Sequence, residues 1–368
     1  MGPIWYYIPL VPFSPLLLIV SLLGQLGHGG YISLSHPMRV PSLRDITHIS
    51  AGGMHSGCIT ASKECYMWGD NSQGQLGINS RDRTTVDQPT LVRCAETQEP
   101  LRALKISCGG MHSGAVDLNG DVYCWGKSDS GQTGSRTWYL GLSTNIYGPK
   151  KVDCLSNAID IRCGGFYTLV LDQYGQVFAM GKEDFGCLGL GLDEPTLDIR
   201  KEGPMLVHKL EETPIKQICC GGWHSFFLSD EGRLYTAGKG EYGRTGLGQE
   251  SSKLSPTLVT KTAEGQEVKD IVQVAAGGAH SIWFDKNNHV FTVGRLENGR
   301  CGIGPTPSGR STMAMDVTSK FPIQGFTVLE VSCGGSHSLV LIEAAEPLDD
   351  QFLVSAASPA FGKLMSSK

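Results

Sequence analysis

The sequence predicts an all-β protein folded as a β-propeller, and three repeated patterns carry this prediction. The first is a pair of glycines followed by a variable residue and, in five of six copies, a histidine. The spacing between successive copies is 55 to 57 residues, and the second glycines are Gly53, Gly110, Gly165, Gly222, Gly278 and Gly335. A period of this size indicates that each copy belongs to one structural unit of a repeat protein.

The second pattern is Gly-x-x-Gly, which begins 21 residues after the second glycine of the pair in five copies. Between the two patterns the sequence alternates as a β-hairpin does. In the second copy, residues 112–118 form a half-apolar run, Asn119-Gly120 marks a turn, and residues 121–125 form the returning strand. Because Asn-Gly favours positive φ at both central residues, we expect a type I′ turn at this place.

The third pattern is a proline with a valine three residues later, as in Pro149 and Val152, ahead of another apolar run such as residues 159–161. Each unit therefore contains about four short strands and no long stretch of 3.6-residue periodicity. A repeat of this size made of four strands is typical of a propeller blade. The sequence thus predicts six countable blades in one domain.

The two ends of the repeat region are complementary. Residues 24–27 (Gly-Gln-Leu-Gly) end a blade that has no beginning, and residues 335–342 begin a blade that has no end. We expect residues 16–30 to complete the last blade, with residues 16–20 pairing as a strand with residues 336–342, so that no sheet edge stays open. The predicted repeats lie near 53–109, 110–164, 165–221, 222–277 and 278–334.

This assignment makes residues 16–347 the propeller, residues 1–15 a hydrophobic extension and residues 348–368 a flexible tail. A signal peptide or membrane anchor is the alternative interpretation of the N-terminal run. No lysine or arginine precedes its apolar core, and four prolines interrupt it, which disfavours that alternative. A third interpretation is a mis-joined translated segment that stands in for the real strand.

The charge and the cysteines restrict the class of protein. A net charge of −5, from 31 basic and 36 acidic residues, is not the footprint of a protein that binds nucleic-acid backbones. No CxxC pair occurs among the twelve cysteines, and four of them share one place before a Gly-Gly pair: Cys108, Cys163, Cys220 and Cys333. Such cysteines are expected to be small buried groups in a reduced protein of the cytoplasm, the nucleus or both.

The motif CGGxHS, the strand at residues 121–126 (DVYCWG) and the run at residues 68–77 (WGDNSQGQLG) together resemble the regulator of chromosome condensation (RCC1-like) repeat family. The resemblance covers residues 24–342. It implies a propeller of typically seven blades, so that this chain is either a six-bladed ring or has lost one unit. Family members include exchange factors for small GTPases, modules of ubiquitin ligases, an ultraviolet-B photoreceptor and chromatin-bound proteins.

The recurring histidines are predicted to be structural. They occupy the same place in each unit and are His55, His112, His224, His280 and His337, with Tyr167 once in their stead. A catalytic group is needed once, whereas a hydrogen bond that fixes a blade is needed in every blade. The paired glycines are likewise interpreted as conformational requirements. We therefore predict no catalytic residue, no metal site, no cofactor and no enzyme activity beyond stimulated nucleotide exchange.

The variable residues of the motif are the predicted partner face: Met54, Met111, Phe166 and Trp223, with Ala279 and Ser336 completing the set. Resemblance to the exchange factor implies an aspartate at one of these places, and none of the six is acidic. Resemblance to the photoreceptor implies clustered tryptophans on one face. Here Trp68 and Trp125 align with a core position instead, which disfavours that function.

A second candidate contact is the non-repetitive loop that contains Arg136, Trp138 and Tyr139, because arginine, tryptophan and tyrosine dominate interface hot spots. The alternative is an ordinary loop packed on its own blade. The resemblance implies an exchange factor or regulator of a small GTPase as the leading function. A non-catalytic scaffold or a substrate-recruitment module, for example in the ubiquitin pathway, is the alternative. We expect a monomer that binds a protein partner and no membrane.

Overall fold

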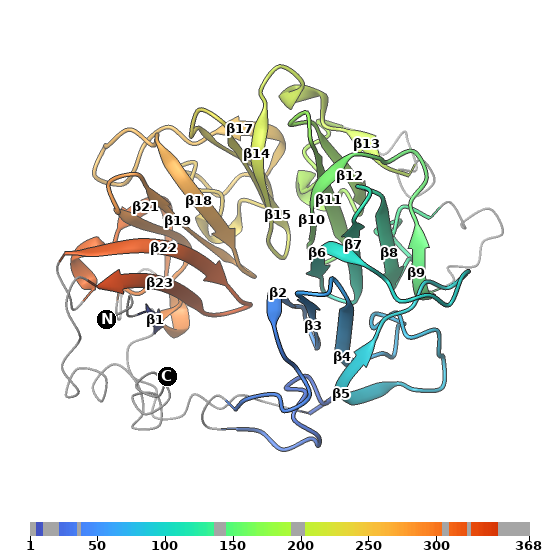
Figure 1. Ribbon diagram of the computed structural model, residues 1–368. Helices are drawn as coiled ribbons and strands as arrows, with labels where there is room; N and C mark the ends of the chain where they lie inside the picture. Colours follow the sequence, from blue (N-terminus) through green and yellow to red (C-terminus); the bar gives the residue numbers. More distant parts are fainter. Residues whose placement is uncertain are drawn as a thin grey trace.

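The computed structural model describes residues 5–9, 22–34, 38–135, 145–192, 203–303, 309–321 and 325–344. In these residues the regular structure consists of β-strands and short 3-10 turns, without an α-helix. Five four-stranded sheets and one three-stranded sheet are formed, which confirms the predicted all-β propeller. Figure 1 shows the sheets arranged around a common centre in chain order, from blue through green and yellow to red. In the described part of the chain, no helix is long and apolar enough to cross a membrane.

The sheets are named here as blades 1 to 6. Blade 1 contains β2 (Ile46–Ala51), β3 (His55–Thr60), β4 (Cys65–Asp70) and β5 (Thr85–Leu91). Blade 2 contains β6 (Ala103–Cys108), β7 (His112–Asp117), β8 (Val122–Gly126) and β9 (Ile146–Lys151). Blade 3 contains β10 (Ala158–Cys163), β11 (Tyr167–Asp172), β12 (Val177–Gly181) and β13 (Met205–Leu206). Each pair of neighbouring strands in a blade is antiparallel.

Blade 4 contains β14 (Ile215–Cys220), β15 (His224–Ser229), β16 (Leu234–Gly238) and β17 (Lys253–Leu258). Blade 5 contains β18 (Ile271–Ala276), β19 (His280–Asp285), β20 (Val290–Arg295) and β21 (Arg310–Asp316). Blade 6 contains β22 (Phe326–Cys333), β23 (Ser338–Ala344) and β1 (Trp5–Pro9). The 3-10 turns are η2 (Asp184–Gly186), η3 (His208–Leu210), η4 (Glu241–Gly243), η5 (Glu297–Gly299) and η6 (Thr318–Lys320).

The hairpin predicted around Asn119-Gly120 is present, but its turn is not type I′. Strands β7 and β8 pair up to Val116 and Val122, and only Gly120 of the turn has a positive φ, at 80°. The side chain of Asp117 accepts hydrogen bonds from the N–H groups of Asn119 (2.8 Å) and Asp121 (2.9 Å). This aspartate holds a longer loop that ends in one left-handed glycine, so the second positive φ is not needed.

The core lies between blades rather than inside them. On five of the six innermost strands one aliphatic side chain points into the preceding blade, whereas Ile49 of β2 is 73% exposed. The five are at most 3% exposed: Ile106, Ile161, Ile218, Val274 and Val331. Each Gly-x-x-Gly segment packs against the outer side of the next blade. Between blades 1 and 2, for example, the Trp125 indole N–H donates to the carbonyl of Gln75 at 2.9 Å. Residues 24–27 occupy the same place on blade 1, where Trp68 donates to Gln25 at 2.9 Å.

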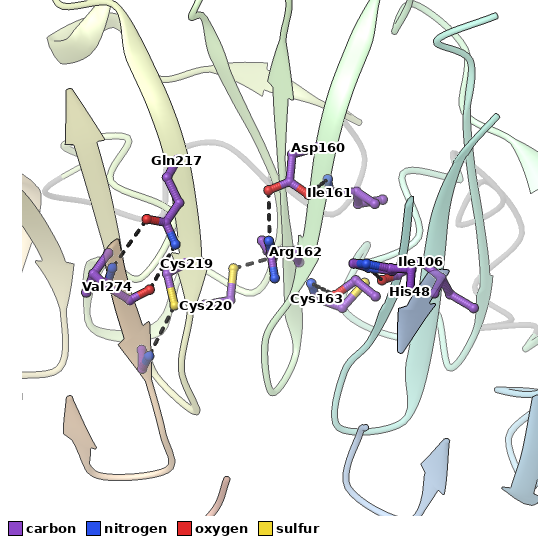
Figure 2. A network of polar contacts seen from close by, with 12 residues as sticks. His48, Ile106, Asp160, Ile161, Arg162, Cys163, Gln217, Cys219, Cys220 and Val274 are labelled. Atoms are coloured by element: carbon purple, nitrogen blue, oxygen red, sulfur yellow. Dashed lines mark hydrogen bonds and ion pairs between the residues drawn. The ribbon is translucent and has the colours of Figure 1, made fainter. Parts of the chain in front are cut away.

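Innermost strands are also joined by side chains that reach backbone groups of the next blade. Figure 2 shows this network, in which His48 Nε2 lies 3.1 Å from the carbonyl oxygen of Ile106 and Gln217 Nε2 donates to Val274 at 2.9 Å. Between them, Arg162 pairs with Asp160 on the same strand at 3.0 Å. Neighbouring blades are therefore tied together at the centre of the ring as well as through the core.

The two chain ends share one blade, as the sequence predicts, but a different segment supplies the strand. Trp5–Pro9 pairs with β23 in antiparallel register, from Trp5 opposite Glu343 to Pro9 opposite Leu339. We predicted residues 16–20 for this role by counting back from Gly24, and those residues lie outside the described part. The predicted extension thus contributes the strand itself, since aromatic and β-branched residues such as those of Trp5–Pro9 favour a pleated sheet.

Candidate partner-binding face

The repeated histidines form hydrogen bonds between blades. His55 Nε2 lies 2.8 Å from Ser113 Oγ, and the same bond recurs from His112 to Thr168, from His224 to Ser281 and from His280 to Ser338. The Ser113 hydroxyl donates its own proton to the carbonyl of Gln75, so His55 must donate through a protonated Nε2. In the third blade Tyr167 takes this place, and its hydroxyl donates to the carbonyl of His224 at 2.6 Å.

Burial keeps these imidazoles neutral. Desolvation lowers the pKa of His55 to about 4 and that of His112 to about 3. A neutral ring with its proton on Nε2 leaves Nδ1 bare, and Nδ1 of the four buried histidines has no hydrogen-bond partner. Within the described ranges, no three His, Cys, Asp or Glu side chains gather as a metal site would require. The geometry therefore gives these residues a cross-linking role.

The paired glycines allow adjacent blades to approach at their turns. The N–H of Gly53 donates to the carbonyl of Gly109 at 3.0 Å. A methyl group on Gly110 would lie 2.5 Å from the carbonyl oxygen of Gly165, which is closer than a real Cβ tolerates. Side chains at the second glycines of the first five copies, from Gly53 to Gly278, would push the blades apart.

The variable residues follow these turns and lie at one end of the strands. Met54 is 48% exposed and Met111 is 42% exposed, while Phe166 and Trp223 are half-buried. The rings of Phe166 and Trp223 belong to blades 3 and 4, and their centroids are 5.3 Å apart. The structure thus brings together two of the predicted contact residues that are 57 positions apart in the chain.

A third aromatic side chain joins this pair and was missed by the sequence prediction. Phe185, in η2 after β12, packs edge-on against Trp223 with a centroid distance of 6.0 Å and an interplanar angle of 90°. Phe185 is 44% exposed and has a φ of +64°, in the left-handed region that bulky residues rarely adopt. The same left-handed φ recurs at Tyr242 and Asn298 in η4 and η5, so this conformation belongs to the repeat, and in η2 it exposes a large apolar side chain beside Trp223.

Three lysines lie over these rings. Lys182 Nζ is 5.5 Å from the Trp223 centroid, Lys239 Nζ is 4.8 Å from that of Phe185, and Lys127 Nζ is 5.7 Å from that of Phe166. Cations at such distances from a ring face attract its negative quadrupole. We name these six residues the aromatic–lysine face: Phe166, Phe185, Trp223, Lys127, Lys182 and Lys239.

The lysines are positioned by the same backbone that carries the variable residues. The N–H of Lys182 donates to the carbonyl of Phe166 at 3.0 Å, and that of Lys239 donates to the carbonyl of Trp223 at 2.8 Å. Each lysine is also paired with the carboxylate two residues later, at 3.1 Å for Asp129, 2.7 Å for Asp184 and 2.6 Å for Glu241. The face therefore offers alternating charges around an apolar centre.

Beneath this surface lies a buried acid. Glu183 accepts a hydrogen bond from the N–H of Leu188 at 3.0 Å through one oxygen, while its other oxygen is buried without a partner. Desolvation raises the pKa of the Glu183 carboxyl to about 8. This carboxyl is therefore largely protonated at neutral pH and supports the loop that carries Phe185.

Two other sequence predictions have different outcomes. Arg136, Trp138 and Tyr139 lie outside the described residues. Trp68 and Trp125 are buried, at 7% and 0% exposure, and serve as core residues.

The three lysines were missed by the sequence prediction, although the sequence holds a signal for them. The residue after the glycine that ends the third strand is basic in four of five repeats: Lys127, Lys182, Lys239 and Arg295, against Asp70.

The six antiparallel blades, joined by one repeated set of cross-links, define a β-propeller assembled from sequence repeats. A family model described as the RCC1-like domain matches residues 21–347. Since this match covers most of the chain, the chain belongs to the RCC1-like domain family.

Curated relatives place this domain in longer proteins of several kinds. The chain is 29% identical to E3 ubiquitin-protein ligase HERC2 of Mus musculus, over 86% of the chain and 6% of that protein. It is 31% identical to probable E3 ubiquitin-protein ligase HERC6 of Homo sapiens, over 81% of the chain and 27% of that protein. It is also 32% identical to ultraviolet-B receptor UVR8 of Arabidopsis thaliana, over 76% of the chain and 60% of the receptor. The chain spans less than a third of the length of either ligase.

Solved structures show the same fold at low identity. Human WBSCR16 matches with a TM-score of 0.72 and 21% identity, over 94% of this chain and 86% of that chain. Prp20p of Saccharomyces cerevisiae, studied for its binding to Gsp1p and histones, matches with a TM-score of 0.60 and 19% identity, over 93% and 94% of the two chains. Both similarities concern the fold.

Proposed function

We propose that this chain is a protein-interaction module that docks a folded partner through its aromatic–lysine face. The observation that carries the proposal is the exposed Phe185, which packs edge-on against Trp223, while Trp223 in turn contacts Phe166. An aromatic cluster surrounded by lysine–carboxylate pairs resembles the apolar centre and polar rim of a protein interface. In such interfaces aromatic anchors supply most of the binding energy. The protein acts by binding and carries out no bond-making step of its own.

Within this class, we propose a small GTPase as the first partner to test and stimulation of nucleotide release as the activity. The support is membership of the RCC1-like family, together with the similarity in fold to Prp20p, which was studied for its binding to Gsp1p. None of the six variable residues is acidic, so any exchange mechanism must use other contacts than a carboxylate at these turns. Recruitment of a protein substrate is the alternative, supported by the similarity to ubiquitin ligases.

The partner is expected in a reducing compartment, the cytoplasm or the nucleus. All twelve cysteines are free thiols, and burial raises the pKa of Cys108 and of Cys163 to about 12. Thiols buried and protonated in this way are unreactive packing groups.

The test compares Trp223→Ala with Tyr174→Ala in affinity purification followed by mass spectrometry. Tyr174 is 67% exposed in the turn between β11 and β12, at the opposite end of blade 3 from Phe166, and serves as the matched control. A direct partner should bind the Trp223 variant about thirty-fold more weakly, corresponding to a hot spot of about 2 kcal/mol. If every captured protein binds both variants equally, the face has no docking role.

A second experiment separates the two activities. Release of a labelled nucleotide is followed by stopped flow on a panel of small GTPases with the wild-type chain and the Trp223 variant. Acceleration that depends on Trp223 supports exchange, whereas binding without acceleration supports recruitment. Acceleration that the Trp223 variant retains in full would place exchange on another surface.

A further inference from the structure

A second group of charged side chains lies next to the aromatic–lysine face and is centred on Tyr242 of η4. The guanidinium carbon of Arg295 lies 5.0 Å from the centroid of the Tyr242 ring, and that of Arg244 lies 5.6 Å from it. Because η4 of blade 4 packs on β20 and β21 of blade 5, Tyr242 and Arg295 meet across the boundary between these blades. A ring between two cations attracts both and helps to fix their positions.

A third arginine of this group is buried with most of its hydrogen-bonding capacity unused. Arg300, directly after η5, is 3% exposed, and among the described residues only its Nε–H has an acceptor, the carbonyl of Glu297 at 2.8 Å. Arg244 is equally buried, but its Nη1 also donates to the carbonyl of Gly278 at 3.1 Å. Burial of terminal N–H groups without an acceptor costs free energy, which a bound anion would offset.

The group contains four cations and two carboxylates: Lys239, Arg244, Arg295, Arg300, Glu241 and Glu297. We name these six residues the arginine site. Lys239 and Arg244 share one carboxylate oxygen of Glu241, at 2.6 and 3.4 Å, and Nε of Arg295 donates to Glu297 at 2.8 Å. Four positive charges less two negative charges leave an excess of +2, in a chain whose net charge is −5.

The like charges of the arginine site act on one another. Burial lowers the pKa of Arg300 and that of Arg244, and the charge of Arg295 acts in the same direction on both. The three guanidinium groups are therefore close enough to repel each other, and an anion placed among them would relieve this repulsion.

The blade structure itself does not require these arginines. Glutamine occupies the second place of the Gly-x-x-Gly segment in three of six copies, and Gln75 there donates to Asp70 at 2.6 Å. Arginine occupies this place only at Arg244 and Arg300. The variable residue is alanine in blade 5 and serine in blade 6, whereas blades 1 to 4 have methionine, phenylalanine or tryptophan. The face thus changes from apolar to basic between blades 4 and 5.

A phosphate monoester fits the arginine site in charge and in shape. It has a charge of about −1.5 to −2 at neutral pH and three strong acceptor oxygens. The planar fork of a guanidinium group bonds two of these oxygens at once. A carboxylate has one negative charge and two oxygens, so it would compensate half of the excess.

We propose that the arginine site binds the phosphate group of a phosphorylated serine or threonine in a partner protein. Arg295, whose side chain is 35% exposed, would bond the phosphate directly, and the terminal nitrogens of Arg300 would donate to it as well. Lys239 Nζ also lies 4.8 Å from the Phe185 centroid, so the phosphate would lie beside the aromatic–lysine face. A protein as the source of the phosphate therefore rests on the function proposed above, whereas binding of the phosphate group does not.

The test follows the arginine Nε–H signals of the full chain by nuclear magnetic resonance after labelling of arginine with nitrogen-15. The probe is N-acetyl-phosphoserine amide, which should shift the signals of Arg295 and Arg300 in a saturable manner. N-acetyl-serine amide should not shift them. N-acetyl-glutamate amide should bind at least ten-fold more weakly, because it supplies less charge, and inorganic phosphate should bind no more tightly than the phosphoserine amide.

Two variants and two controls test the site on the chain. Arg295→Ala and Arg300→Gln should each weaken binding at least ten-fold, and glutamine should leave the fold intact because the repeat has it at this place elsewhere. Arg233→Ala should change the affinity less than two-fold, since this 57% exposed side chain pairs with Glu231 at the opposite end of blade 4. Trp223→Ala should also change it less than two-fold, so that the arginine site and the aromatic–lysine face are judged separately.

Four results would overturn the proposal. The first two are an absence of shifts at Arg295 and Arg300, and an affinity that neither Arg295→Ala nor Arg300→Gln reduces. The third is a glutamate amide that binds as tightly as the phosphoserine amide, because the site would then recognise acidic side chains in general. The fourth is inorganic phosphate that binds at least ten-fold more tightly than the phosphoserine amide, because a free anion would then be the ligand.

Discussion

Lowering the pH from 7 to 5 should destabilise the folded protein by several kcal/mol, because four buried histidines must stay neutral. The folded-state pKa is about 4 for His55 and His280 and about 3 for His112, and burial lowers that of His224 as well. In the unfolded chain a histidine titrates near 6.5. The unfolded state therefore binds more protons below that pH, so the stabilisation is fully present above pH 6.5 and is lost toward pH 4.

The magnitude follows from the separation of these values. At pH 5, each unfolded histidine gains roughly 2 kcal/mol from protonation, and four histidines together cost the folded state about 7 kcal/mol relative to pH 7. Glu183 acts in the opposite direction, because its folded-state pKa of about 8 lies above the unfolded value. Its contribution stabilises the protein by about 2 to 3 kcal/mol over the same interval. The net loss is about 5 kcal/mol, a large part of the usual stability of a domain.

Urea unfolding followed by tryptophan fluorescence at pH 7, 6 and 5 measures this loss directly. His112→Gln provides the control, since an amide can donate to Thr168 without titrating, and it should remove about a quarter of the histidine contribution. An unfolding free energy that is flat between pH 7 and pH 5 would refute the reasoning. So would a His112→Gln variant with the full pH dependence of the wild type.

Three substitutions test other parts of the structure in the same unfolding assay. Phe185→Asn should raise the stability by about 1 kcal/mol, because asparagine tolerates the left-handed backbone and Asn298 already adopts a φ of 60° at the equivalent place; a loss of stability would contradict the proposed strain. Gly110→Ala should destabilise by about 3 kcal/mol or more, whereas Gly335→Ala should stay within about 0.5 kcal/mol; equal effects would contradict the close approach of blades 2 and 3 at Gly110. Trp125→Phe should cost about 2 kcal/mol through the lost bond to Gln75 and the space left behind, and a neutral result would exclude this bond as a blade contact.

The repeat made the blades predictable from the sequence. Glycine pairs, hairpin turns and closing segments recur at fixed offsets, so that each strand from β2 to β23 follows from local patterns. The strand that completes blade 6 does not follow in this way. Pairing of Trp5–Pro9 with β23 joins residues more than 300 positions apart, and counting from Gly24 cannot choose between two apolar segments.

The candidate face was predicted in part for a related reason. When the repeats are aligned, Phe166 and Trp223 share one position, directly after the glycine pair. Phe185 and the lysines stand at other positions of the repeat. Their proximity arises because the hydrogen bond from Lys182 to the carbonyl of Phe166 draws two of these positions together. An alignment of one repeat on another reveals such positions, but the distance between them is a property of the folded blade.

The repeated bonds between blades also determine how the protein should come apart. Among the described residues, a histidine or Tyr167 bonds each blade to the next from blade 1 to blade 6, so the stability of the propeller is a sum of blade and nearest-neighbour terms. Blades 3 and 4, which carry Phe166 and Trp223, are bonded in this way on both sides, so we expect them to be among the last to open.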